Sequence, residues 1–229
     1  MAELHIGSAM KQVMGTTKDP GVSLFRSLRD QWRDLEIDYN ELDVPDFSQA
    51  PQRLKDLAEE TLSWATKHLA KKTFPRDDYK EFMELVIISL GGKVEGFVFK
   101  LPGPYHHARW MSKVIYNLKM KLVSKFFEMS EDEKEKVNQV VEFILLFYTK
   151  YWFTTPLAGS AARQDLDFMS SILEYRNLVV VNDLAERGIH LATDFIKRVD
   201  SEEQRGALSQ VVDFSGRVKD TSKASLKLC

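Results

Sequence analysis

Apolar residues recur at every fourth position through one long central segment, and this spacing restricts the possible folds more than any other feature. The residues with this period are Trp110, Val114, Leu118, Leu122 and Phe126. Such a period places its members on one face of an α-helix. Pro102-Gly103-Pro104, which disfavours helix, stands shortly before the segment. The pattern predicts a helix from about Tyr105 to Phe127.

Comparable spacing and helix-start signals predict more helices along the chain. Pro51 suits a first helical turn, with Ser48 as the cap before it, and Ser130 with Glu133 forms a capping box. Gly91-Gly92 is expected to end a helix rather than form a phosphate-binding loop. The expected additional helices cover about 19–35, 48–72, 75–90, 130–151, 161–175, 181–199 and 201–218.

The fold class expected from these segments is all-α and bundle-like. Residues 94–101 alternate loosely between apolar and other side chains, so a short strand or hairpin is possible there. We expect an N-terminal segment at 1–18, a single helical domain at 19–218 and a basic flexible tail at 219–229.

Composition excludes several classes of protein. The net charge of −2 provides no overall attraction to nucleic acid or membrane, and one cysteine, Cys229, cannot form an internal disulfide. The most apolar stretch, Val140–Phe153, is short and is interrupted by Glu142 and Lys150. We expect a soluble intracellular protein, nuclear or cytoplasmic, with no membrane association and no evident small-molecule ligand.

A basic stripe accompanies the apolar stripe of the central segment and is the first candidate binding surface. Its members are Arg109, Lys113, Lys121 and Lys125. With Lys119, the segment carries five positive charges against Glu128, and such a ridge could follow a phosphate backbone. The alternative is the solvated face of an amphipathic helix, partly neutralised by the acidic residues at 131–135.

A second candidate is the carboxylate pair Asp183 and Glu186, which share one face of a predicted helix. Two carboxylates can hold a divalent ion, but metal-assisted phosphoryl chemistry usually needs more ligands than one such pair. Asp183 would equally favour the N-terminal end of its helix. No complete catalytic site is therefore expected, and no cofactor, with Mg²⁺ relevant only if an intact nuclease site were completed.

Several stretches resemble transposon-derived proteins of invertebrate genomes, which are in turn distantly similar to hAT-type, RNase H-like transposases. The stretches are Leu4-His5-Ile6, 14–25, 78–81 through 90–92, 102–113 and 180–188, and together they span about residues 4–215. The segment from Pro102 to Lys113 is the most specific of them.

This resemblance implies a piece of an RNase H-like nuclease with a large helical insertion. Arg109-Trp110 matches an Arg-Trp pair of that insertion, and Glu186-Arg187 matches the pair that supplies the last metal-binding carboxylate. Two further aspartates would lie on strands upstream of His5. The expected function is a catalytically incomplete, transposase-derived helical domain, with weak DNA binding or self-association. The alternative is a helical scaffold that binds proteins.

Overall fold

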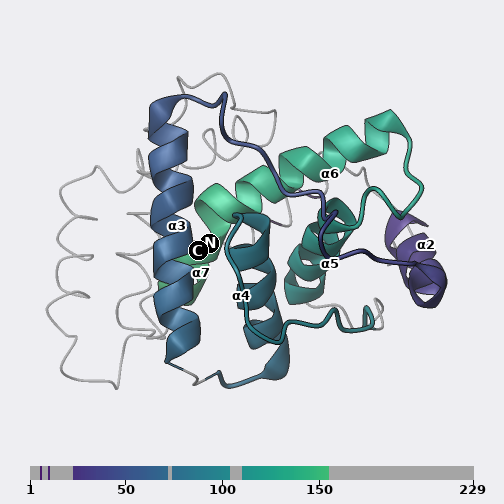
Figure 1. The fold of residues 1–229 in the computed structure, drawn as a ribbon, viewed down its shortest axis with the longest axis horizontal. Coiled ribbons are helices and arrows are strands. Elements are labelled where there is room, and N and C mark those ends of the chain that lie inside the picture. Colours follow the sequence, from purple (N-terminus) through teal and green to yellow (C-terminus); the bar gives the residue numbers. More distant parts are fainter. Residues whose placement is uncertain (1–5, 7–9, 11–22, 72–73, 104–109, 155–229) are drawn as a thin grey trace, which may run out of the picture. The chain divides into compact units, whose positions relative to one another are not determined.

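The computed structural model describes residues 6, 10, 23–71, 74–103 and 110–154, and these residues are mainly helical (Figure 1). Their elements are α2 (Ser23–Gln31), the 3-10 turn η1 (Trp32–Asp34), α3 (Gln52–Ala70), α4 (Asp77–Ser89), α5 (Trp110–Leu122), α6 (Glu131–Phe143), the π-helical η3 (Ile144–Tyr148) and α7 (Thr149–Thr154). No strand occurs within these ranges, which confirms the all-α prediction. The possible strand or hairpin at 94–101 does not form.

Residues Met10–Thr149 form one compact unit, and α4 lies at its centre. The helix packs against α3 on one side and α5 on the other, and α5 also packs against α6 (Figure 1). The apolar core of α4 consists of Phe82, Met83, Leu85, Val86 and Ile87, all buried. A helix with apolar side chains around most of its circumference is stable only when neighbours cover it, which explains this central position.

The two glycines after α4 end the helix, as predicted. Gly91 has a φ of 78°, a left-handed conformation that suits glycine at a helix C-terminus. Gly92 is needed for a different reason. A Cβ atom there would lie 2.6 Å from Ile87 Cγ2 and 2.8 Å from Leu62 Cδ1. Gly92 therefore allows α3 and α4 to approach each other closely.

Two predicted helix boundaries were wrong. The helix predicted to reach Phe127 ends at Leu122 and continues only as turns, because Leu122 O accepts the backbone N–H of Asp43 at 2.9 Å. Ser48 does not cap α3; its N–H and hydroxyl donate to Asp46 instead, and Pro51 precedes the helix. The start predicted near Tyr105 lies outside the described residues.

The capping box at Ser130 is confirmed. Ser130 Oγ accepts the N–H of Glu133, while the Glu133 carboxylate accepts the N–H of Ser130. From there α6, η3 and α7 continue one another without a break to Thr154. None of the described helices is both long and apolar enough to cross a membrane.

A buried lysine joins the central helices to the loops around them. Lys119 on α5 is 1% exposed, and its Nζ lies 2.6 Å from Glu81 Oε1 on α4. The same ammonium donates to Lys100 O at 2.6 Å and lies 5.2 Å from the centre of the Trp32 ring. Burial lowers the pKa of Lys119, and the ion pair with Glu81 only partly offsets this effect.

We predict that Glu81→Gln destabilises the fold by about 3 kcal/mol, because it leaves a buried ammonium without its counter-charge. Replacing both partners, as Glu81→Leu with Lys119→Met, should cost far less or even stabilise the fold. Urea unfolding of wild type, Glu81→Leu, Lys119→Met and the double variant forms a double-mutant cycle that measures this, with Glu81→Gln measured beside them. A double variant as unstable as the sum of its two single variants would contradict the coupling.

Candidate functional site

The basic stripe predicted on the central helix is largely engaged within the fold. Lys121 is mostly buried and pairs with Asp43 at 2.7 Å. Lys113 is half-buried and Lys125 is exposed, and neither forms an ion pair with any residue that the structure describes. Arg109 lies outside the described residues. The stripe therefore presents two lysines rather than a continuous ridge over residues 110–125.

Lys119 was wrongly counted among the charges of this ridge. Lys119 directly follows Leu118 and so lies on the flank of the apolar stripe opposite the basic stripe, where a lysine is normally exposed. Its position opposite Glu81 explains why it is buried instead. Lys119 has a structural role, and its charge is not accessible to a ligand.

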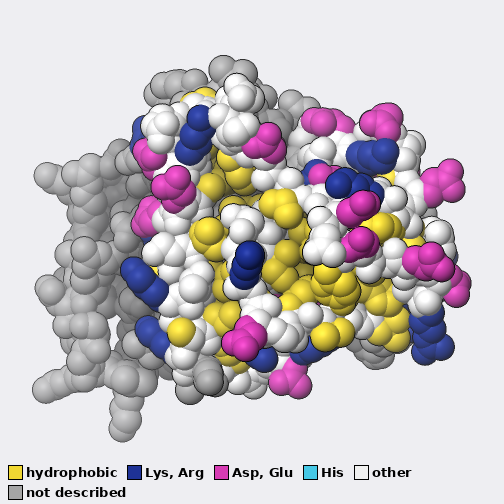
Figure 2. Space-filling view, in the orientation of Figure 1, with side chains coloured by type: hydrophobic (Ala, Val, Ile, Leu, Met, Phe, Trp, Pro, Cys, Tyr) yellow, Lys and Arg dark blue, Asp and Glu magenta, His cyan; other side chains and the backbone are white. Residues whose placement is uncertain are grey.

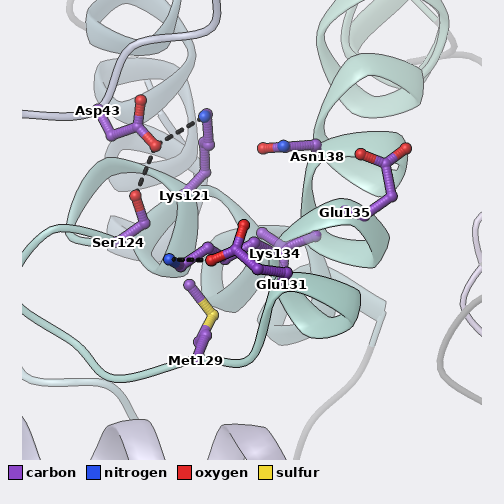
Figure 3. A pocket seen from close by; sticks show the side chains of 9 residues that line it. Asp43, Lys121, Ser124, Met129, Glu131, Lys134, Glu135 and Asn138 are labelled. Carbon is purple, nitrogen blue, oxygen red and sulfur yellow. Dashed lines mark hydrogen bonds and ion pairs between the residues drawn. The ribbon is translucent and has the colours of Figure 1, made fainter.

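A small polar pocket of about 140 Å³ lies where α5 ends and α6 begins (Figure 3). Its lining residues are Asp43, Lys121, Ser124, Met129, Glu131, Lys134, Glu135, Val137 and Asn138. The charges in the pocket pair largely with one another, since Lys121 contacts Asp43 and Lys134 contacts Glu131 at 2.7 Å (Figure 3). These ion pairs leave little unpaired charge in the pocket for a ligand. They stabilise the turn between α5 and α6.

Asp43 is the centre of this network. Its carboxylate accepts hydrogen bonds from Lys121 Nζ at 2.7 Å and from Ser124 Oγ at 2.5 Å. Partial burial acts to raise the pKa of Asp43, but these bonds and the Lys121 charge outweigh it, so the pKa is lowered. With its N–H bound to Leu122 O, Asp43 attaches the segment between α2 and α3 to the end of α5.

A second surface, which the sequence reasoning did not select, lies where this same segment meets the loop after α4. We call the side chains Trp32, Tyr39, Phe97 and Phe99 the aromatic seam. Phe99 lies 5.8 Å from Trp32 and 5.4 Å from Tyr39, between ring centres. The backbone N–H of Phe99 also donates to the Tyr39 hydroxyl at 3.1 Å. The seam therefore holds two irregular segments side by side.

Large apolar side chains protrude beside the aromatic seam. Tyr39 is 47% exposed, Val98 68% and Leu101 49%, and within the described ranges no other large hydrophobic residue is exposed to this degree. Figure 2 shows hydrophobic side chains gathered on the face that it presents, with charged side chains among and around them. Exposed apolar residues mark an interaction surface when they form a contiguous patch.

Acidic side chains border the exposed apolar residues. Between Trp32 and Phe47 the sequence holds six carboxylates and one basic residue, Arg33. Asp34, Glu36 and Glu41 are exposed, and none of them forms an ion pair with a residue that the structure describes. The signal for this surface was the alternation of acidic and apolar residues at 34–47, together with the loose alternation at 94–101.

The carboxylates predicted as a remnant metal site, Asp183 and Glu186, lie outside the described residues. Among the residues that are described, no group of three or more His, Cys, Asp or Glu side chains could hold a metal ion. The two candidate surfaces are therefore Lys113 on α5 with Lys125 just after it, and the apolar, acid-bordered face at the seam.

We predict that Asp43→Asn destabilises the fold by about 1 kcal/mol at neutral pH, a modest value because the pair with Lys121 is partly exposed. Since the folded-state pKa of Asp43 lies below its ordinary value of 3.8, this stabilisation is present above that value and lost as the pH falls through the folded pKa. Urea midpoints for wild type and variant should therefore converge in acid.

Asp34→Asn is the matched control, because Asp34 is exposed and forms no ion pair with a described residue. Its effect on the urea midpoint should be small at every pH. A difference between wild type and Asp43→Asn that stays constant down to low pH would show that the carboxylate charge is not responsible.

No family model, curated protein or solved structure matches this chain.

Proposed function

We propose that this protein is a helical interaction module that binds another protein through the exposed residues Tyr39, Val98 and Leu101. The observation that carries the proposal is the exposure of these three side chains next to the packed aromatic seam. Tyrosine and large aliphatic side chains supply much of the buried area at the centre of protein interfaces.

The construction of the face supports this proposal. Phe97 and Phe99 pack edge to face with ring centres 4.9 Å apart. The backbone N–H of Phe99 donates a hydrogen bond to the Tyr39 hydroxyl. Lys119 holds the loop from beneath through Lys100 O. Side chains whose backbone is already fixed lose less conformational entropy on binding than those of a free loop. A partner would therefore meet a partly preorganised surface.

We predict that a photo-crosslinking amino acid at position 98 forms a defined adduct with a protein partner in cells that produce the chain. Val98 is suitable because it is the most exposed of the three and its loss removes little internal packing. Mass spectrometry of the adduct identifies the contacting peptide. Leu101→Ser should greatly reduce the yield of this adduct.

The matched control places the same crosslinker at Glu59, an exposed position on α3. An adduct with a second copy of the chain would also support an interaction role and would identify the partner as self. If position 98 gives no adduct beyond those at position 59, the proposed function is wrong.

We also propose, as a second candidate, weak DNA binding by a domain of transposon origin. The resemblance supports this candidate, as do Lys113 and Lys125, which form no ion pair with a residue in the described ranges. Two lysines would give only non-specific affinity, with a dissociation constant on the order of 10⁻⁴ M. Glu186 would then be the remnant of a divalent-metal site.

For this candidate we predict that Lys113→Glu with Lys125→Glu abolishes binding to duplex DNA, measured by fluorescence anisotropy at several salt concentrations. Lys121 is left intact, because a glutamate beside Asp43 would disturb the fold. Lys67→Glu on α3 with Lys71→Glu at its C-cap is the control with the same change of net charge. Equal losses in both pairs, or retained binding in the first pair, would count against a specific role for the stripe.

A further inference from the structure

We propose that the partner segment recognised by this face is cationic and apolar, with lysine or arginine side chains alternating with or flanking large hydrophobic ones. This inference rests on the proposed function and adds the chemistry of the partner. It is drawn from the charges of the segment that carries Tyr39, whose ring contacts the loop of Val98 and Leu101, and from how few of those charges are used within the fold.

The negative charge is concentrated on one side of the face. Residues 34–46 contain Asp34, Glu36, Asp38, Glu41, Asp43 and Asp46. Only Asp43 is paired with a lysine, at 2.7 Å, while Asp38 and Asp46 accept hydrogen bonds from neighbours in their own turns. Glu36 and Glu41 are exposed and have no recorded partner in the described structure. These carboxylates are therefore available to cations of a partner.

The apolar residues lie next to these carboxylates. Tyr39 stands between Glu36 and Glu41 in the sequence, and its ring contacts Phe97 and Phe99 across the seam. Val98 and Leu101 belong to the same loop as those two phenylalanines. A partner that covers the apolar side chains thus places its own flanks beside the acidic segment, where opposite charge favours association.

The basic residues near the face are fewer. Arg33 precedes the acidic segment, and Lys93 and Lys100 flank the apolar loop, where Glu95 also lies. Residues 34–46 therefore carry six carboxylates and no basic residue, whereas 93–101 carry two lysines and one glutamate, a net charge of +1. We infer that the cations of the partner lie along the segment between α2 and α3, and that its apolar residues cover Val98 and Leu101.

The test uses the full chain and three short fluorescein-labelled peptides of equal length. The first alternates leucine with lysine, the second leucine with glutamate, and the third serine with lysine. Fluorescence anisotropy should show binding of the leucine–lysine peptide that weakens as salt is raised. The other two should bind about tenfold more weakly, because each lacks one of the two required features.

Variants of the protein locate the binding. Val98→Ser with Leu101→Ser should weaken binding of the leucine–lysine peptide about tenfold, because two exposed apolar contacts are lost. Glu36→Gln with Glu41→Gln should weaken binding of the same peptide about threefold. It should also make the affinity less dependent on salt concentration. Far-ultraviolet circular dichroism confirms that each variant keeps its helices.

Glu59→Gln with Glu128→Gln is the matched control, because it removes two exposed carboxylates that lie outside the acidic segment. This pair should leave the affinity unchanged. Equal binding of the leucine–glutamate peptide, or equal losses in both glutamine pairs, would overturn the proposed charge preference.

The two proposals fail in different ways. A crosslinked partner peptide at position 98 that lacks basic residues would overturn the cationic preference and leave the interaction function intact. If sedimentation velocity shows that the chain dimerises and Val98→Ser abolishes the dimer, the occupant is a second copy, and the inferred partner is wrong. An absence of any adduct at position 98 would remove both proposals.

Discussion

The position of one buried ammonium organises the described part of this molecule. Lys119 reaches from α5 to Glu81 on α4, to the carbonyl of Lys100 and to the ring of Trp32. A buried cation is unfavourable unless several groups surround it, so the three neighbours must stay together. The loop after α4 has no sheet or helix of its own, and this contact gives it a defined place against α5.

Asp43 plays a comparable role for the segment between α2 and α3. It binds the last carbonyl of α5 through its N–H and two side chains through its carboxylate. With one irregular segment fixed by Asp43 and the other by Lys119, the aromatic seam can form between them. The exposed apolar face thus depends on polar contacts that lie beneath and beside it.

The helices could be predicted from the sequence because their signals are local. The capping box at Ser130 and the glycines after α4 act within a few residues, and both were correctly read. The end of α5 was missed because it is set by Asp43, about eighty residues earlier in the chain. Lys119 was misplaced for the same reason, since its counter-charge lies on another helix. The apolar face was missed because no local pattern shows that Tyr39 meets Phe99. The helical spacing of apolar residues predicts which side of a helix is buried. It does not predict which charged or aromatic residue from a distant part of the chain contacts that helix.

The close contact at Gly92 has a consequence for recognising relatives of this chain. A Cβ atom there would lie too close to Ile87 and Leu62, so the side chains of both helices would have to shift. Exposed residues such as those of the acidic segment are free to change as partners change. A glycine at this position, one residue after the left-handed Gly91 and following a long apolar helix, should persist much longer. It offers a structural fingerprint by which divergent sequences with the same helical core can be aligned.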